Sequence, residues 1–366
     1  MSKKHENRRQ IELEHNIEAK LRQAVDISLS LRYGEAPDPL VSERVNTEWA
    51  AIERSSLFSE ISILHDIATY LQNAKYPCYM DGLAGSSFIL YLLGITSSNP
   101  LPPHTYCPKC KGIHWVSSFA DGFDIPAGSA CENDGTSLLS DGHNIPWQTI
   151  WGYGDFTASL EISMPVSLKS IFNELVPNFV RQELIQETEI SMKDDHIKIR
   201  NLTLRFDLDL DSNEVFYQPL TSGKVLTYAL KHWKSLADYR PEDSEMPTPV
   251  SFADVVSVAG IFHSEGAWDD VSQYMVEEAG RPLSDMISFR DDVFYYLLAH
   301  GFTEKDAWRG MNRVRKGQGL PTITDEMMEA KDKWKMARCE RIEYLPAKSQ
   351  ILETLLFKIR SDRQST

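Results

Sequence analysis

The stretch from residue 76 to 155 constrains the fold most, because a glycine–serine turn and a cysteine pair follow one another closely there. It begins with Met80-Asp81-Gly82-Leu83-Ala84-Gly85-Ser86-Ser87, followed by an apolar run from Phe88 to Ile95. Glycine permits close backbone approach, and Ser86 or Ser87 can cap a helix that starts at Phe88. The N–H groups at such a helix start suit a phosphate, but a plain capped helix is the commoner meaning of a lone G-x-x-G-S.

The cysteines indicate a metal site. Five cysteines make an odd number at uneven spacing, and the first ten residues are polar and basic, so a disulfide framework is not expected. Cys107-x-x-Cys110 is half of a zinc site. Residues 97–154 show little periodicity, so we expect them to need a bound metal to hold their loops together. The other half would be Cys131 with one further donor, and an incomplete set that binds no metal is the opposing interpretation. The candidate donors are Asp134, at the same x-x spacing from Cys131, and Glu132, His114 and His143.

Length and charge limit the classes of function. A chain of 366 residues can form two or three domains, and 42% hydrophobic and 25% charged residues are typical of globular proteins. No apolar run approaches the ~18–20 residues that span a bilayer, so we expect a cytoplasmic protein without a membrane partner. The net charge of −15 is spread along the chain, which lacks the basic footprint of an autonomous nucleic-acid binder.

The hydrophobic periodicity predicts an α+β fold. Three amphipathic helices are expected before the glycine turn, at residues 11–31, 40–57 and 59–71. A helix over 167–184 and alternating strands over 190–215 follow, and the proline-rich, acidic residues 242–249 read as a linker. The remainder predicts helices at residues 252–262, 269–278, 286–298, 304–316, 325–343 and 350–360.

Two charged clusters have both a functional and an ordinary interpretation. Asp207, Asp209 and Asp211 alternate with leucines, which predicts three carboxylates on one face of a strand. Paired carboxylates are what a two-metal phosphoryl-transfer site requires, yet a solvated acidic edge is commoner. Similarly, a basic cluster before the turn Gly317-Gln318-Gly319 can contact a phosphate or simply stabilise a helix C-terminus. The residues of this basic cluster are Arg309, Arg313, Arg315 and Lys316.

Taken in order, these motifs resemble the PolC-type catalytic subunit of bacterial DNA polymerase III. One block, residues 31–155, carries the family's G-S-V-G-S-S turn at 82–87, its N-P-L-P-P-H run at 99–104 and its four-cysteine zinc element. A second block, from 251 to about 357, looks like the polymerase fingers and carries a counterpart of S-G-L-S-H-G-T-D-V-W at 259–268. The resemblance implies a polymerase-palm-like nucleotidyltransferase frame with structural zinc, followed by a helical fingers-like part. It implies nucleotide or phosphate contacts at Gly82, Gly85, Ser86, Ser87, His263, Arg313, Arg315 and Lys316.

The chain departs from the family at the positions that carry chemistry. An arginine before the turn is replaced by Asp81, and the fourth zinc cysteine by Asp134. The two aspartates of the family's P-D-I-D-L-N-F, which hold the catalytic metals, correspond to Ser159 and Glu161. The family's H-G-T-D likewise loses its aspartate to Gly266. Loss of one metal ligand typically removes most two-metal activity, so the resemblance implies an inactive polymerase frame.

We therefore expect a trimmed homologue whose parts are a palm-like region (1–165), a small α/β segment (166–247) and a fingers-like region (248–366). The family's exonuclease, PHP, oligonucleotide-binding and helix-hairpin-helix modules have no counterpart in these residues. The expected role is binding, either to a replication protein such as the polymerase or the sliding clamp, or to primer–template DNA. The sequence Glu353-Thr354-Leu355-Leu356-Phe357 resembles a clamp-binding peptide, but a helix that buries its apolar residues explains it as well.

The alternative function is enzymatic. In that case Asp207, Asp209 and Asp211 replace the lost metal pair in a magnesium-dependent nucleotidyltransferase or nuclease. This alternative predicts that the three aspartates lie beside residues 82–87 in the fold.

Overall fold

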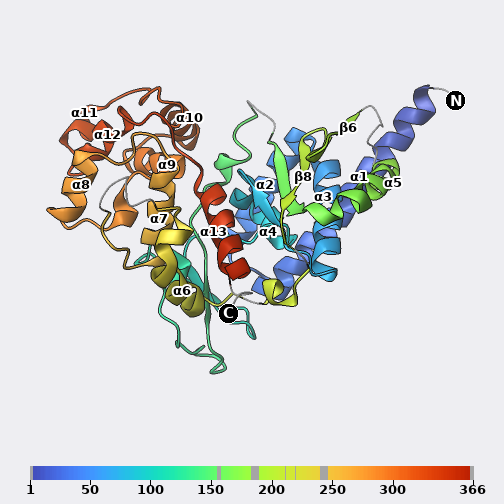
Figure 1. The fold of residues 1–366 in the computed structure, drawn as a ribbon, viewed down its shortest axis with the longest axis horizontal. Helices are drawn as coiled ribbons and strands as arrows, with labels where there is room; N and C mark the ends of the chain where they lie inside the picture. Colours follow the sequence, from blue (N-terminus) through green and yellow to red (C-terminus); the bar gives the residue numbers. More distant parts are fainter. Residues whose placement is uncertain are drawn as a thin grey trace.

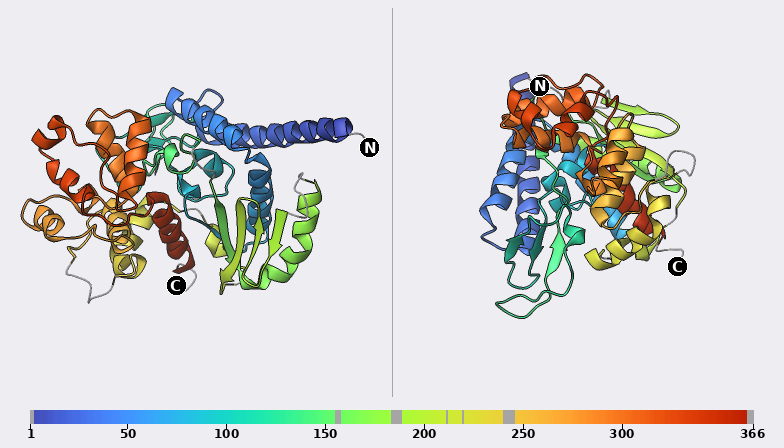
Figure 2. Two further views of the ribbon diagram at one scale, coloured as in Figure 1. Left: turned by 90° about the horizontal axis from the view of Figure 1, so that it is seen from above. Right: turned by 90° about the vertical axis from the view of Figure 1, so that its left-hand side faces the viewer.

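The computed structural model describes residues 3–154, 158–182, 189–210, 212–218, 220–239 and 246–362. Three helices precede the glycine turn, as the periodicity predicts. Asp38 caps the second helix by accepting a hydrogen bond from the Leu40 N–H, 2.9 Å away. The N-terminal half of the first helix extends beyond the body of the molecule (Figure 2). The bounds are α1 (Lys3–Tyr33), α2 (Pro39–Ser55) and α3 (Phe58–Asn73), then β1 (Tyr79–Asp81) and α4 (Phe88–Leu92).

A five-stranded mixed sheet lies beside these helices, in the order β1-β5-β8-β7-β6. Strands β5 and β8 are parallel, and the other neighbouring pairs are antiparallel. Alternate residues such as Ile162 and Phe206 point into the core, where α5 adds Phe172 against Phe206. This confirms the mixed α+β class. The bounds are β5 (Leu160–Pro165), α5 (Lys169–Gln182), β6 (Ile190–Met192), β7 (His196–Ile199) and β8 (Leu202–Leu208).

The expected strand with three carboxylates is shorter than predicted. Strand β8 ends at Leu208, so Asp207 lies in the strand and Asp209 lies beyond it. The partner strand explains this end, because the register shifts at Met164 and Pro165 and proline has no N–H to continue the ladder. Asp211 lies outside the described residues. The prediction of three carboxylates on one strand face was therefore wrong for Asp209.

The segment after α4 forms a second, three-stranded antiparallel sheet in the order β3-β2-β4. Its strands have only three residues each, and the long loops between them project from the lower side of the molecule (Figure 1). The sequence pattern did not predict this sheet. The bounds are β2 (His104–Tyr106), β3 (Ile113–Trp115) and β4 (Leu139–Asp141).

The C-terminal part is helical, as expected, with two differences. The helix α6 (Ser222–Leu236) was not predicted, and the single helix expected over 325–343 is two short helices separated by residues 330–332. Residues 242–245 of the predicted linker lie outside the described residues. The bounds are α7 (Phe252–Phe262), α8 (Asp270–Glu277), α9 (Arg290–Ala299), α10 (Glu304–Val314), α11 (Asp325–Glu329), α12 (Lys333–Cys339) and α13 (Lys348–Asp362).

Helix α13 lies between the sheet region and the helical part (Figure 1). Its apolar residues Ile351, Leu355 and Leu356 are buried with α6 and α7, while Phe357 packs against Tyr79 of β1 at a ring distance of 4.8 Å. The clamp-like sequence is therefore part of a helix whose apolar residues pack into the molecule. One apolar core joins α1–α4 to β5–β8, so it extends across the predicted boundary at residue 165. The division into three parts stays a prediction. Among the described helices none is both long enough and apolar enough to cross a membrane.

Candidate functional site

The serine end of the glycine turn is buried, and a carboxylate of the chain itself accepts hydrogen bonds there, although the Ser86 hydroxyl has no partner among the described residues. Ser86 and Ser87 have no exposed surface, and the buried carboxylate of Glu48 in α2 sits at the start of α4. Glu48 accepts hydrogen bonds from the Phe88 N–H (3.0 Å), the Ile89 N–H (3.2 Å) and the Ser87 hydroxyl (2.6 Å). Arg44 pairs with this carboxylate at 2.5 Å. A carboxylate thus fills the place that the exposed helix start would offer a phosphate.

Helix α13 closes the other side of the turn. Glu353, also buried, accepts hydrogen bonds from the N–H and hydroxyl of Ser98 at 2.8 and 2.6 Å. Burial raises the pKa of Glu353 above its ordinary value. A Cβ on Gly85 would lie 2.6 Å from the Ser98 hydroxyl oxygen and 3.0 Å from Cγ of Glu353, so only glycine fits here. The phosphate-binding role of Gly82, Gly85, Ser86 and Ser87 stays a prediction.

One face of the main sheet carries Ser159 and Glu161, which the resemblance equates with the family's metal-binding aspartates. Ser159 is exposed just before β5, and Glu161 in β5 forms an ion pair with Arg205 of the neighbouring β8. The hydroxyl of Ser163 donates to the Asp207 carboxylate at 3.4 Å. Glu161 therefore has a cationic partner from its own sheet.

The aspartates of the enzymatic alternative are only partly brought together. Asp207 belongs to β8, which is separated from β1 by β5. Asp209 lies past the strand end and is exposed. Within the described residues, the one group of three or more side chains placed to hold a metal ion is a different one, containing the cysteines.

That group is the predicted set Cys107, Cys110, Cys131 and Asp134, whose ligand atoms all lie within 4.8 Å of one another. The two sulfurs of Cys110 and Cys131 are 3.5 Å apart, and the Cys107 sulfur is 3.6 and 3.7 Å from the two oxygens of Asp134. Zinc–sulfur bonds of ~2.3 Å in a tetrahedron put ligand atoms about 3.7 Å apart, so the donor set fits one ion. Of the four donors considered from the sequence, the structure brings Asp134 to the cysteines.

Two turns hold these ligands in place. In the first, the Cys110 N–H donates to the Cys107 sulfur at 3.3 Å, and the Cys107 N–H bonds the Gly112 carbonyl at 2.9 Å. In the second, the Cys131 N–H donates to the Thr136 carbonyl, and the Gly135 N–H donates to the Cys131 carbonyl, each at 2.8 Å. Hydrogen bonds from Thr136 lower the pKa of Asp134, which keeps its carboxylate ionised as a ligand must be. The cluster can hold a metal such as zinc.

The basic residues proposed as phosphate contacts lie at a helix end. Arg313 donates to the Gln318 carbonyl at 2.9 Å, and Arg315 donates to the Asn312 side chain at 3.0 Å. Lys316 is exposed after α10. These contacts agree with the helix-end interpretation, although a phosphate role stays a prediction.

His263, also predicted to contact a nucleotide, ends α7. Its Nδ1 lies 2.8 Å from the Ala259 carbonyl, and its Nε2 lies 3.9 Å from an Asp238 carboxylate oxygen. The described contacts of His263 are thus within the helical part.

The buried role of Glu48 was not predicted from the sequence. A signal was present, because Glu48 falls on the apolar face of its helix together with Val41, Val45 and Ile52. A carboxylate on such a face must find partners in the core.

A buried polar network around Asp141 was not predicted either. The Tyr91 hydroxyl and the Asn99 amide donate to this carboxylate at 2.7 and 2.9 Å, and Arg32 lies 3.7 Å away. These residues are far apart in the chain, so no local pattern could join them.

Comparison with known proteins agrees with the resemblance. Residues 19–189 match the family described as the bacterial DNA polymerase III alpha NTPase domain. Over most of its length the chain is also similar to PolC-type DNA polymerase III proteins, at 21–24% identity among those compared. The resemblance stated from the sequence is thereby confirmed.

The similarity covers a minor part of each relative. The protein from Ureaplasma parvum serovar 3 is 24% identical over 429 aligned positions, which cover 86% of this chain and 30% of the relative. The proteins from Caldanaerobacter subterraneus subsp. tengcongensis and Clostridium perfringens are each 22% identical, covering 90% of this chain and 32% and 30% of the relatives. The chain therefore spans about a third of the length of these relatives.

Proposed function

We propose that this homologue of PolC-type DNA polymerase III acts by binding and does not incorporate nucleotides. The observation that carries the proposal is the pair of residues at the family's metal-binding positions. Ser159 offers no carboxylate, and Glu161 is neutralised by Arg205. A two-metal mechanism needs carboxylates free to bridge cations, and one replaced ligand typically removes most of the rate.

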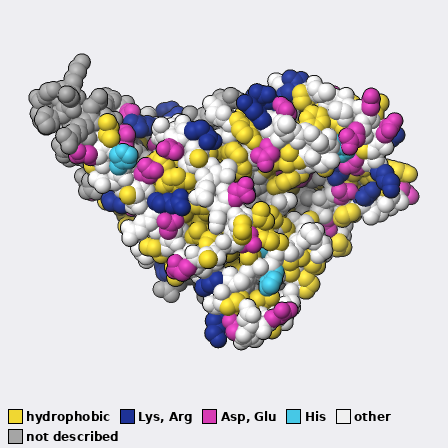
Figure 3. Space-filling view, turned by 180° about the vertical axis from the view of Figure 1, so that it is seen from behind, with side chains coloured by type: hydrophobic (Ala, Val, Ile, Leu, Met, Phe, Trp, Pro, Cys, Tyr) yellow, Lys and Arg dark blue, Asp and Glu magenta, His cyan; other side chains and the backbone are white. Residues whose placement is uncertain are grey.

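The partner is a replication protein, the polymerase or its sliding clamp, or primer–template DNA. Charge favours a protein partner, because the chain carries a net −15 and phosphate binding depends on basic surfaces. On the face shown in Figure 3, basic and acidic side chains are interspersed. Similarity to a polymerase family supports a role in DNA replication in general terms.

The experiment is a binding assay in two arms. The full chain, carrying an affinity tag, is used to recover partners from lysate of its host, with recovery of the polymerase or the clamp as the expected result. A labelled primer–template is titrated in parallel at 50 and 200 mM salt. Recovery of no replication protein, together with no DNA binding at 50 mM salt, would contradict the proposal.

We also propose that zinc occupies the site formed by Cys107, Cys110, Cys131 and Asp134. Zinc bound there would join the two turns and stabilise the loops of the small sheet, as structural zinc does in other proteins. Here the ion has no part in a reaction.

A metal-dependent nucleotidyltransferase or nuclease is the second candidate. The observation in its favour is that Asp207 lies next to β5, on the same face of the sheet as Ser163. Magnesium titration followed by NMR or calorimetry tests it, with Asp207→Asn as the comparison. Saturable magnesium binding that this substitution removes would support the enzyme; absence of binding would exclude it.

A further inference from the structure

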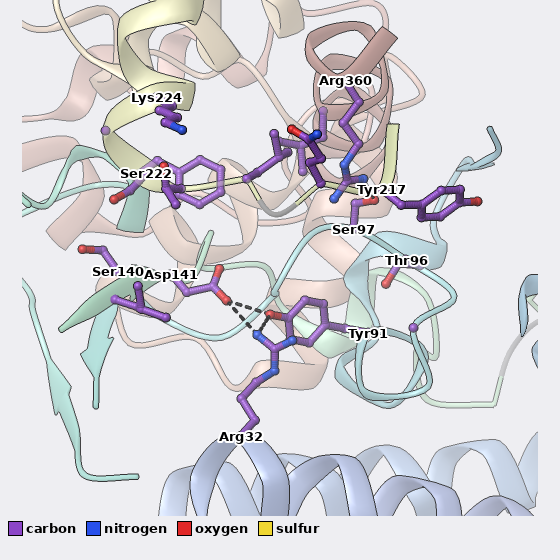
Figure 4. A pocket seen from close by; sticks show the side chains of 18 of the residues that line it. Arg32, Tyr91, Thr96, Ser97, Ser140, Asp141, Tyr217, Ser222, Lys224 and Arg360 are labelled. Atoms are coloured by element: carbon purple, nitrogen blue, oxygen red, sulfur yellow. Dashed lines mark hydrogen bonds and ion pairs between the residues drawn. The ribbon is translucent and has the colours of Figure 1, made fainter. Parts of the chain in front are cut away.

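A cavity of about 690 Å³ adjoins the polar network around Asp141. The loop after α4, strand β4, the start of α6 and the end of α13 surround it (Figure 4). Neither the cysteine cluster nor Ser159, Glu161 or Asp207 lines it. Its volume falls in the ~300–1,000 Å³ range of small-molecule sites.

The cavity lining is positively charged in an acidic protein. Arg32 reaches in from α1 and Arg360 from α13 on the opposite side, while Lys224 stands at the start of α6 (Figure 4). Asp141 is the one carboxylate among the lining residues, and it accepts a hydrogen bond from Tyr91 and pairs with Arg32. Arg360 donates to the Ser97 hydroxyl and interacts with the buried Glu353 carboxylate, whereas Lys224 forms no ion pair within the described residues. A local excess of cations in a concave site favours an anionic ligand.

The start of helix α6 adds further donors. Residues 221–224 line the cavity, and the N-cap residue Thr221 makes no capping hydrogen bond through its side chain. The first turn of a helix carries N–H groups without helical acceptors and the positive end of the dipole. This helix has 15 residues, so its N-terminus can contribute to anion binding.

Thr96 supplies an independent sign of a ligand. Its side chain is 7% exposed, its hydroxyl oxygen has no hydrogen-bond partner in the described structure, and it points into the cavity (Figure 4). Buried hydroxyls are normally hydrogen-bonded, because an unpaired one is costly. A ligand oxygen beside Thr96 would satisfy this group.

We propose that the cavity binds a phosphate monoester. The cations, the α6 N-terminus and the Thr96 hydroxyl bind the phosphate oxygens, and the apolar lining residues Leu138, Leu220 and Leu356 contact the organic part. Two sources share this chemistry, a free nucleoside 5′-monophosphate and the 5′-phosphorylated end of a DNA strand. The inference goes beyond the proposed function and does not depend on it.

Calorimetry with matched ligands tests the proposal. A nucleoside 5′-monophosphate is compared with its nucleoside, and a 5′-phosphorylated oligonucleotide with the same strand ending in a hydroxyl. We expect at least one phosphorylated ligand to bind about tenfold or more tightly than its unphosphorylated counterpart, since the difference is a set of charge-assisted hydrogen bonds. The arm that binds identifies the source.

Two substitutions locate the binding. Lys224→Gln and the isosteric Thr96→Val should each weaken binding, by about tenfold and about threefold or more respectively. Lys231→Gln, the same charge change at an exposed position further along α6, should leave it unaltered. Thr96→Val removes a hydroxyl that has no partner, so an unchanged melting temperature verifies that this variant is folded. Equal affinity for phosphorylated and unphosphorylated ligands, or binding unaffected by both variants, would overturn the proposal.

Discussion

At the scale of single residues, buried carboxylates decide what the polymerase-like turn can do. Glu48 occupies the start of α4 from one side, and Glu353 holds the Ser98 backbone and hydroxyl from the other. The N-terminus of α4 thus binds an anion, but that anion is the Glu48 carboxylate of the same chain. The glycine turn could be predicted from the sequence. The carboxylates that bond to it could not, because they belong to α2 and α13 and meet the turn only through tertiary contacts.

Removing the Glu48 carboxylate should destabilise the protein strongly. Glu48→Ala leaves Arg44 without its buried partner and frees two N–H groups of α4, which we expect to lower the free energy of unfolding by about 3–5 kcal/mol. Urea unfolding followed by circular dichroism measures this. The control is Glu53→Ala, at an exposed position of the same helix, and equal small effects of the two substitutions would refute the assigned role.

A second buried carboxyl makes stability depend on pH. Burial raises the pKa of Asp292 to about 6, so the folded protein binds this proton more strongly than the unfolded chain does. The unfolding free energy attributable to Asp292 therefore falls as pH rises from about 4 to about 6. Asp292→Asn keeps the oxygen that accepts the Ser288 and Phe289 N–H groups but does not titrate.

We expect Asp292→Asn to gain stability relative to the natural protein across this window, by up to about 3 kcal/mol, with no further gain above it. Unfolding by urea at pH 4, 5, 6 and 7 gives the comparison. Asp66→Asn, on an exposed face of α3, serves as the control. A difference between Asp292→Asn and the natural protein that is the same at every pH would contradict the assignment.

At the scale of elements, periodicity predicted most helices but not where all of them begin and end. The amphipathic helices α1–α3 and α10 follow their apolar patterns, and the largely apolar α7 is buried on all sides. Strand β8 ends early because its partner reaches Pro165, which no pattern within 202–211 could indicate. The cysteine spacing predicted the ligand set, since Cys-x-x-Cys and Cys-x-x-Asp each place two donors on one turn.

The cysteine turns should depend on a bound metal. We expect the purified protein to contain about one zinc per chain, and both chelation and Cys107→Ser to lower the melting temperature. Elemental analysis and thermal unfolding measure the two effects. Cys78→Ser, which lies outside the cluster, should keep its zinc. Protein that neither contains zinc nor binds it on addition would exclude the site.

The contact between α13 and the glycine turn should tolerate no side chain at residue 85. Gly85→Ala places a methyl group against Ser98 and Glu353, so we expect a loss of about 1–3 kcal/mol in unfolding free energy. Gly223→Ala in α6 meets no atom within 4 Å and should be neutral or slightly stabilising. If Gly85→Ala is as stable as Gly223→Ala, α13 does not close the turn in this way.

At the scale of the whole molecule, the resemblance to PolC-type polymerases could be predicted from ordered motifs, and the arrangement of the parts could not. Helix α13 joins the sheet region to the helical part through contacts between residues as distant as Ser98 and Glu353. The cavity beside α6 likewise gathers Arg32, Thr96, Lys224 and Arg360 from four segments. Neither feature has a local sequence signal.

The proposed binding role requires that this polymerase homologue incorporates no nucleotides. Its most direct test is extension of a labelled primer on a template by the purified chain, with Mg²⁺ or Mn²⁺ and all four nucleotides, beside an active PolC-type polymerase. We expect no extension above a protein-free control with either metal. Template-dependent extension that Asp207→Asn abolishes would contradict the proposed role and establish a working metal site at Asp207 on the main sheet.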